Sequence, residues 1–148
     1  MKKEFVMRGQ TVSGQSEVLN FSGFKPGMAY KLTEFQLYPS AAIHGADFEY
    51  VGSITAGKTA VAPSDINFND DGLIGTTLIS ESASAANPVS VLSVINDTFL
   101  ITQNLILMVQ DMSGSSLKVN WQCKFEAVKM SGSEEAVTNY KQFAISDS

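Results

Sequence analysis

The sequence predicts an all-β protein: a single antiparallel β-sandwich of about eight strands in a jelly-roll-like arrangement, with a short C-terminal helix. Three observations predict it. Short segments alternate apolar and polar residues with a period of two, turn-forming residues separate them at short intervals, and helix patterns are scarce and come late in the chain. Since 148 residues suit one hydrophobic core better than two, we expect one domain over residues 1–148.

The first elements are an expected N-terminal arm over residues 1–14 and a short strand over residues 15–21. Residues 28–38 follow as a longer strand with alternating apolar side chains. The apolar positions change phase near Thr33 and Glu34. A β-bulge is therefore expected there.

Four more strands are expected over residues 46–56, 72–80, 89–95 and 98–101. The first alternates clearly, and the last two are rich in β-branched and apolar residues on either side of an Asn-Asp turn. Each is short, as strands of a sandwich usually are.

The strongest strand pattern covers residues 117–127, which alternate over eleven positions and so have one buried face. Residues 105–109 are apolar on both faces, as in a strand inside a sandwich or under a neighbouring subunit. Turn residues at 111–116 separate the two segments. We expect them to form a hairpin.

The C-terminal segment, residues 131–148, carries the helix pattern. Ser131 and Glu134 have the spacing of a capping box. Apolar residues after them fit one face of a short helix: Ala136, Val137, Tyr140 and Ala144.

Composition narrows the classes of function. Fifteen acidic and ten basic residues give a net charge of −5, and Arg8 is the one arginine, so direct nucleic-acid binding is not expected. No apolar stretch approaches 18 residues and the N-terminus lacks the apolar core of a signal peptide, so no membrane contact is expected. One cysteine, Cys123, and one histidine, His44, exclude an internal disulfide and any site that needs two of either.

Residues 52–59, GSITAGKT, match the phosphate-binding loop, in which backbone amides and a lysine hold phosphates. That loop opens a helix, yet Pro63 follows four residues after Thr59 and turn residues come next. No alternation of strands and helices surrounds the match. We therefore expect a strand that runs into a loop, and no enzymatic activity.

Oxygen-bearing side chains occupy every second position of the loop at 65–72: Asp65, Asn67, Asn69 and Asp71. Calcium-binding loops gather their ligands in this way. However, Asp70 stands where such a loop has glycine, and Thr76 where it has a closing acid. Ordinary turn chemistry is the main expectation, a calcium site at these four residues is the alternative, and no other cofactor is expected.

Two further chemistries involve the remaining candidate residues: nucleophilic catalysis and sugar stacking. Cys123 falls on the apolar face of its strand, where a cysteine behaves as a small hydrophobic residue, and His44 falls in a loop. Five aromatic residues could form a platform on one sandwich face: Trp121, Tyr30, Tyr38, Tyr50 and Phe48. Trp121 alternates in phase with its apolar neighbours, so we expect it in the core.

Strand-and-turn patterns at residues 27–35, 96–105 and 119–122 resemble those of small viral and phage virion proteins of the single-jelly-roll capsid or capsid-decoration type. The resemblance implies a capsid subunit or decorating protein that acts by self-assembly through sheet edges, loops and an extended terminus. It implies a homo-oligomer or contacts with other capsid proteins, in a virion assembled after synthesis in the host cytoplasm. Genome-contacting coat proteins often carry a basic arm, here reduced to three residues, so a protein-facing position is expected.

Contact residues are therefore expected in place of catalytic ones. Few charges suit repeated protein contacts, because desolvating a charge at an interface is costly. Apolar residues near both termini are the candidate interface: Phe5, Met7, Tyr140, Phe143 and Ile145. Alternatively they close their own sandwich. The alternative function is a small ligand- or carbohydrate-binding β-sandwich module, with or without calcium. A nucleotide-using enzyme is the third hypothesis.

Overall fold

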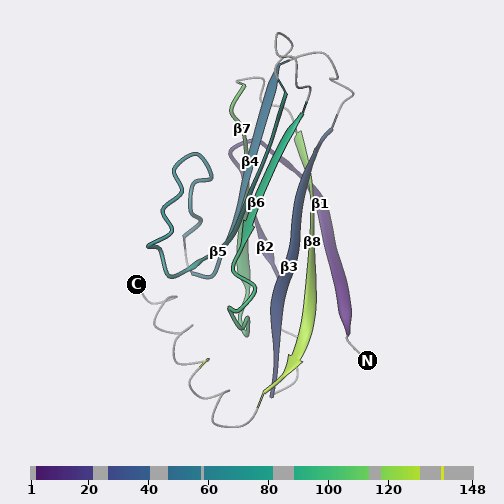
Figure 1. Ribbon diagram of the computed structural model, residues 1–148, viewed down its shortest axis with the longest axis vertical. Coiled ribbons are helices and arrows are strands. Elements are labelled where there is room, and N and C mark those ends of the chain that lie inside the picture. The colour runs from purple at the N-terminus through teal and green to yellow at the C-terminus, as the bar shows by residue number, and fades with distance from the viewer. Residues whose placement is uncertain are drawn as a thin grey trace.

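Two antiparallel sheets make up the protein in a computed structural model that describes residues 3–21, 27–40, 47–57, 59–81, 89–113, 118–130 and 138. The strands are β1 (Glu4–Val12), β2 (Ser16–Leu19), β3 (Met28–Pro39), β4 (Phe48–Thr55), β5 (Leu73–Glu81), β6 (Ser90–Ile95), β7 (Leu105–Asp111) and β8 (Lys118–Lys129). One sheet has the order β1-β8-β3 and the other β2-β7-β4-β5-β6. Figure 1 shows the two layers face to face, which confirms the predicted sandwich.

The strand order is that of a jelly roll with one change. A jelly roll pairs strands whose numbers add to nine, and β1 pairs with β8, β2 with β7, and β4 with β5. The remaining pair would join β3 to β6, but β6 pairs with β5. β6 still lies against β3, where the Ser93 hydroxyl donates to the carbonyl of Phe35 (3.3 Å). The sheets therefore hold three and five strands instead of four each.

The core lies between the sheets and follows the period-two pattern. Along β8, alternate side chains are buried, from Val119 to Phe125, while those between them are half-buried on the other face. At one end the core is aromatic, where the rings of Phe5, Phe21 and Phe125 pack with centroids 5.0–6.1 Å apart.

The predicted bulge in β3 is confirmed. Its register against β8 shifts between Leu32 and Glu34, so Thr33 is the extra residue. The Thr33 hydroxyl donates to the carbonyl of Lys124 (3.1 Å). This extra residue explains the phase change in the sequence, because Leu32 and Phe35 both point into the core.

The N-terminal segment differs from the expectation of an arm, since β1 pairs with β8 along its whole length. Phe5, Met7, Gly9 and Thr11 face inward, and the residues that alternate with them face solvent. The pattern is hard to recognise in sequence because Gly9 interrupts the inward face and Val6 is exposed. Pairing with β1 covers an edge of β8 that would otherwise be open.

The predicted strand at residues 98–101 is instead a single bridge. Tyr30 and Ile101 exchange two backbone hydrogen bonds of 3.0 and 2.7 Å. The side chain of Asn96 accepts from the amide of Thr98 (3.2 Å), which turns the chain before a strand can extend. The number of strands is as predicted, with β1 in the place of this segment.

The predicted hairpin between residues 105–109 and 117–127 is wrong. β7 lies in the five-stranded sheet and β8 in the three-stranded sheet. Both edges of β8 are already paired, with β1 and β3, so β7 cannot pair with it. The two strands instead turn their apolar faces toward each other across the core.

The expected C-terminal helix lies outside the described residues except for Thr138. Across the described part of the chain, no helix has the length and apolar character that a membrane span needs.

Candidate functional site

β6 exposes apolar side chains along most of its length. Val91 and Leu92 are 65% and 66% exposed, and Val94 and the preceding Val89 are also exposed. We call these four residues the β6 edge. One side of β6 pairs with β5, and its other side pairs with no strand in the described part of the chain. The β6 edge is therefore an uncovered apolar surface at the end of a sheet.

Edge strands normally carry features that prevent association, such as charges, prolines or bulges. β6 has the sequence SVLSVI, with none of these, and its register against β5 is regular. The opposite edge strand, β2, also exposes a valine, Val18, but carries Glu17 next to it. The Thr11 hydroxyl donates to the carboxylate of Glu17 (3.0 Å). A charged side chain on an edge strand disfavours pairing with another copy. The two edges of the five-stranded sheet therefore differ in chemistry.

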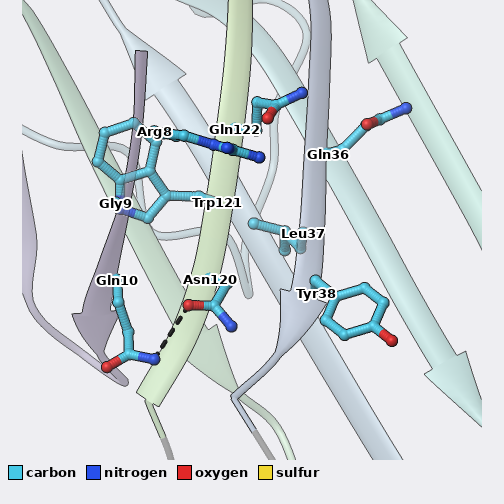
Figure 2. A pocket seen from close by; sticks show the side chains of 9 residues that line it. All are labelled: Arg8, Gly9, Gln10, Gln36, Leu37, Tyr38, Asn120, Trp121 and Gln122. Carbon is cyan, nitrogen blue, oxygen red and sulfur yellow. Dashed lines mark hydrogen bonds between the residues drawn. The ribbon is translucent and has the colours of Figure 1, made fainter. Parts of the chain in front are cut away.

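A second feature is a groove of about 640 Å³ on the outer face of the three-stranded sheet (Figure 2). Two rows of cross-strand partners furnish its polar side chains, with Arg8, Gln122 and Gln36 in one and Gln10, Asn120 and Tyr38 in the other. We call these six residues the polar groove.

Hydrogen bonds and packing hold part of the polar groove in place. The Gln10 side-chain amide donates to Asn120 Oδ1 (3.0 Å), drawn in Figure 2, and Asn120 Nδ2 donates to the carbonyl of Pro39 (3.3 Å). On the core side of β1, the indole of Trp121 occupies the space that a side chain at Gly9 would fill. Its Nε1 donates to Thr11 Oγ1 (2.9 Å). β1 is thereby fixed against β8.

The interface residues predicted near the N-terminus lie partly in the core. Phe5 and Met7 are half-buried and pack against the core, and the Phe5 ring stacks on Phe125 at 5.4 Å. This placement agrees with the alternative that they close their own sandwich, and a contact with a partner through them stays a prediction. The predicted C-terminal interface residues, Tyr140, Phe143 and Ile145, lie outside the described residues.

The segment that matches a phosphate-binding loop begins inside β4, as expected from its context. Gly52 lies in the strand, where a Cβ would come within 3.0 Å of the Phe35 ring from the opposite sheet. The Ser53 hydroxyl donates to the carbonyl of Val61. The backbone amide of Val61 donates in turn to Thr55 Oγ1 (3.3 Å). The glycine and the hydroxyls thus serve packing and loop attachment. Lys58 lies outside the described residues.

The predicted metal-binding loop shows turn chemistry. Asn67 Oδ1 accepts from the amide of Asn69 (2.9 Å), and Asp70 Oδ1 accepts from the amide of Gly72 (3.0 Å). Asp65 and Asp71 are exposed, and within the described ranges no three His, Cys, Asp or Glu side chains gather as metal ligands. Calcium at Asp65, Asn67, Asn69 and Asp71 stays a prediction.

Cys123 is fully buried, and its thiol lies 3.6 Å from the carbonyl oxygen of Met7. Burial raises the pKa of the thiol to about 12, so it is protonated at neutral pH and a poor nucleophile. His44 lies outside the described residues, so no pairing with Cys123 is described.

The five aromatic residues of the candidate sugar platform separate into two groups. Trp121, Tyr30, Tyr50 and Phe48 are at most 9% exposed, which confirms the core position predicted for Trp121. Tyr38 alone among the five is exposed, at 71%, and it belongs to the polar groove. The amides around it were missed in the sequence, although Asn120 and Gln122 stand at alternate positions on the wet face of β8.

Comparison with models of known protein families and with curated proteins finds no match for this chain. The functional conclusions therefore depend on the chemistry of two surfaces. One is the apolar β6 edge, and the other is the polar groove on the opposite sheet.

Proposed function

We propose that the protein is a structural subunit that associates with copies of itself through the β6 edge and acts by contact, without catalysis. The observation that carries the proposal is an edge strand that is exposed, apolar and uncharged, with no feature that would keep another copy away. The same patch on two copies can meet across a twofold axis, as in most homo-oligomers.

Association at the β6 edge is favourable on physical grounds. Fully burying an aliphatic side chain of this size is worth about 1.5–3 kcal/mol. Of the three exposed on β6 itself, Leu92 and Val94 share one face of the strand and Val91 lies on the other. Because β6 has no charged residue, little charge has to be desolvated. Antiparallel pairing of β6 with its copy would also use backbone groups that no described strand pairs.

A virion shell is the assembly that we propose, as a capsid subunit or as a protein that decorates the capsid. Its support is the jelly-roll-like strand order, an architecture that occurs in viral capsid domains, together with the resemblance of the strand-and-turn patterns. The net charge of −5 favours solubility of free copies before they associate. Partners in this proposal are further copies and other capsid proteins.

The test is the molar mass of the full chain across a range of concentrations, by light scattering coupled to size exclusion. We expect wild-type protein to form concentration-dependent oligomers, and Val91→Lys to weaken association by about tenfold or more, because a buried lysine must be desolvated. Val18→Lys is the matched control, since Val18 is 64% exposed on the opposite edge of the same sheet.

The outcomes separate clearly. A wild-type protein that stays monomeric at millimolar concentration overturns the proposal. If Val18→Lys disrupts the oligomer and Val91→Lys does not, the contact lies at β2 and the role of the β6 edge is wrong. Electron microscopy of the wild-type oligomer then distinguishes a closed shell from a smaller assembly, and the absence of any shell in the presence of partner capsid proteins contradicts the virion role.

A further inference from the structure

We infer that the polar groove on the outer face of β1-β8-β3 is a saccharide-binding site. The inference is independent of association at β6, because the polar groove belongs to the other sheet. Its volume of about 640 Å³ is within the range of small-molecule sites.

The charge of the lining restricts the class of ligand. Among the nine lining residues the one charged side chain is Arg8, and there is no carboxylate. A cationic ligand therefore finds no counter-charge, and a nucleic-acid backbone would need several cations. Amides and a hydroxyl furnish most of the polar surface, which disfavours a lipid chain. An uncharged or singly anionic ligand rich in hydroxyl groups fits this lining.

The amide side chains match the hydroxyl groups of a sugar. A glutamine or asparagine offers donors on nitrogen and acceptors on oxygen, and a hydroxyl both donates and accepts. Within the described part of the chain, the side chains of Arg8, Gln36 and Gln122 make no hydrogen bond or ion pair. In Figure 2 the Arg8 side chain extends across β8 toward Gln122, its cross-strand neighbour. This row therefore has donors and acceptors available for ligand hydroxyls.

The other row combines a fixed amide pair with an aromatic ring. Asn120 is held by Gln10 on one side and by the carbonyl of Pro39 on the other, so its orientation is set before a ligand arrives. Tyr38 is 71% exposed and offers a ring face for the C–H groups of a pyranose, with its hydroxyl as a further hydrogen-bonding group. Polar and apolar contacts thus come from neighbouring strands, as a sugar requires.

The position of these residues on a paired sheet strengthens the inference. All six belong to strands, and β8 is hydrogen-bonded on both sides, so their spacing is set by the sheet. Trp121 and Gly9 lock β1 to β8 beneath the groove.

The test measures saccharide binding by the full-length protein in its native oligomeric state. A glycan array with neutral and sialylated oligosaccharides is screened first, and the best ligand is then titrated by isothermal calorimetry. We expect a defined subset of glycans to bind. Tyr38→Ala and Gln122→Ala should each raise the dissociation constant about tenfold, since each removes a contact made with the ligand. Thermal melting checks that both variants remain folded.

Two matched controls keep the result specific. Phe68→Ala removes an aromatic ring that is 69% exposed outside the polar groove, and Gln15→Ala removes an exposed glutamine in the β1–β2 turn. Both should bind like wild type. No binding across the array overturns the inference, as does binding that falls equally in the controls. If the polar groove is instead covered by a neighbouring subunit, the oligomer binds no glycan and the inference is likewise wrong.

Discussion

Cys123 illustrates how burial of a single residue makes stability depend on pH. Its pKa is raised to about 12 because the thiolate would be desolvated, whereas in the unfolded chain a thiol ionises near its usual value of about 8.5. Below that value both states are protonated and the stabilisation is fully present. As the pH rises toward 12, the unfolded chain loses its proton first, so stability is lost.

We therefore predict that the free energy of unfolding falls more steeply above pH 9 in wild type than in Cys123→Ala, by up to about 1.4 kcal/mol per pH unit. Urea titrations at several pH values between 7.5 and 10.5 measure both slopes. Burial also raises the pKa of Tyr30 and Tyr50, but these residues are present in both proteins and their effect cancels. Parallel slopes would show that the thiol is accessible.

Residue-level features could be predicted where one strong pattern determined them. The core positions of Trp121 and Cys123 follow from the alternation in β8. The exposure of Tyr38 beside four amides could not be predicted, because it depends on which three strands become neighbours. Pairing between segments more than a hundred residues apart, such as β1 with β8, leaves no local trace in the sequence.

At the scale of elements, the number of paired edges decides how strongly each strand is held. β8 pairs on both sides with β1 and β3, while β6 pairs on one side. Native hydrogen exchange should therefore be slower in β8 than in the edge strand β6 when the protein is dilute. At concentrations that favour oligomers, exchange should slow in β6 and stay unchanged in β2.

Mass spectrometry of deuterated peptides measures this directly. Fast exchange in β8 would contradict the strand order, and equal protection of β6 at all concentrations would contradict a contact there.

Most of the strands could be predicted because their alternation is local, but β1 could not, since Gly9 and Val6 blur its pattern. The prediction that β7 and β8 pair as a hairpin was wrong for a related reason. An apolar face does not indicate whether a strand pairs beside its neighbour or packs against it from the other sheet.

At the scale of the whole molecule, net charge and interface chemistry act in opposite directions. Copies with a charge of −5 repel one another, whereas β6 contributes no charge to the contact. Added salt screens the repulsion without removing ion pairs, so we predict that association strengthens by about twofold to tenfold between 50 and 500 mM NaCl. Sedimentation equilibrium measures the change, and weaker association in high salt would mean that ion pairs hold the interface.

The overall architecture could be predicted as a sandwich because eight short strands in one small domain have few other arrangements. The unequal division into three and five strands could not, because nothing local distinguishes pairing of β6 with β5 from pairing with β3. That one choice leaves β6 at the end of the larger sheet.

The position of Trp121 has a practical consequence. It is the one tryptophan of the chain, it is 7% exposed, it packs against Gly9 of β1, and both residues border the polar groove. Its fluorescence spectrum is therefore an intrinsic reporter of two separate events. Detachment of β1 would admit water to the indole and red-shift the emission, whereas a ligand above the sheet would change its intensity while the strand stays in place.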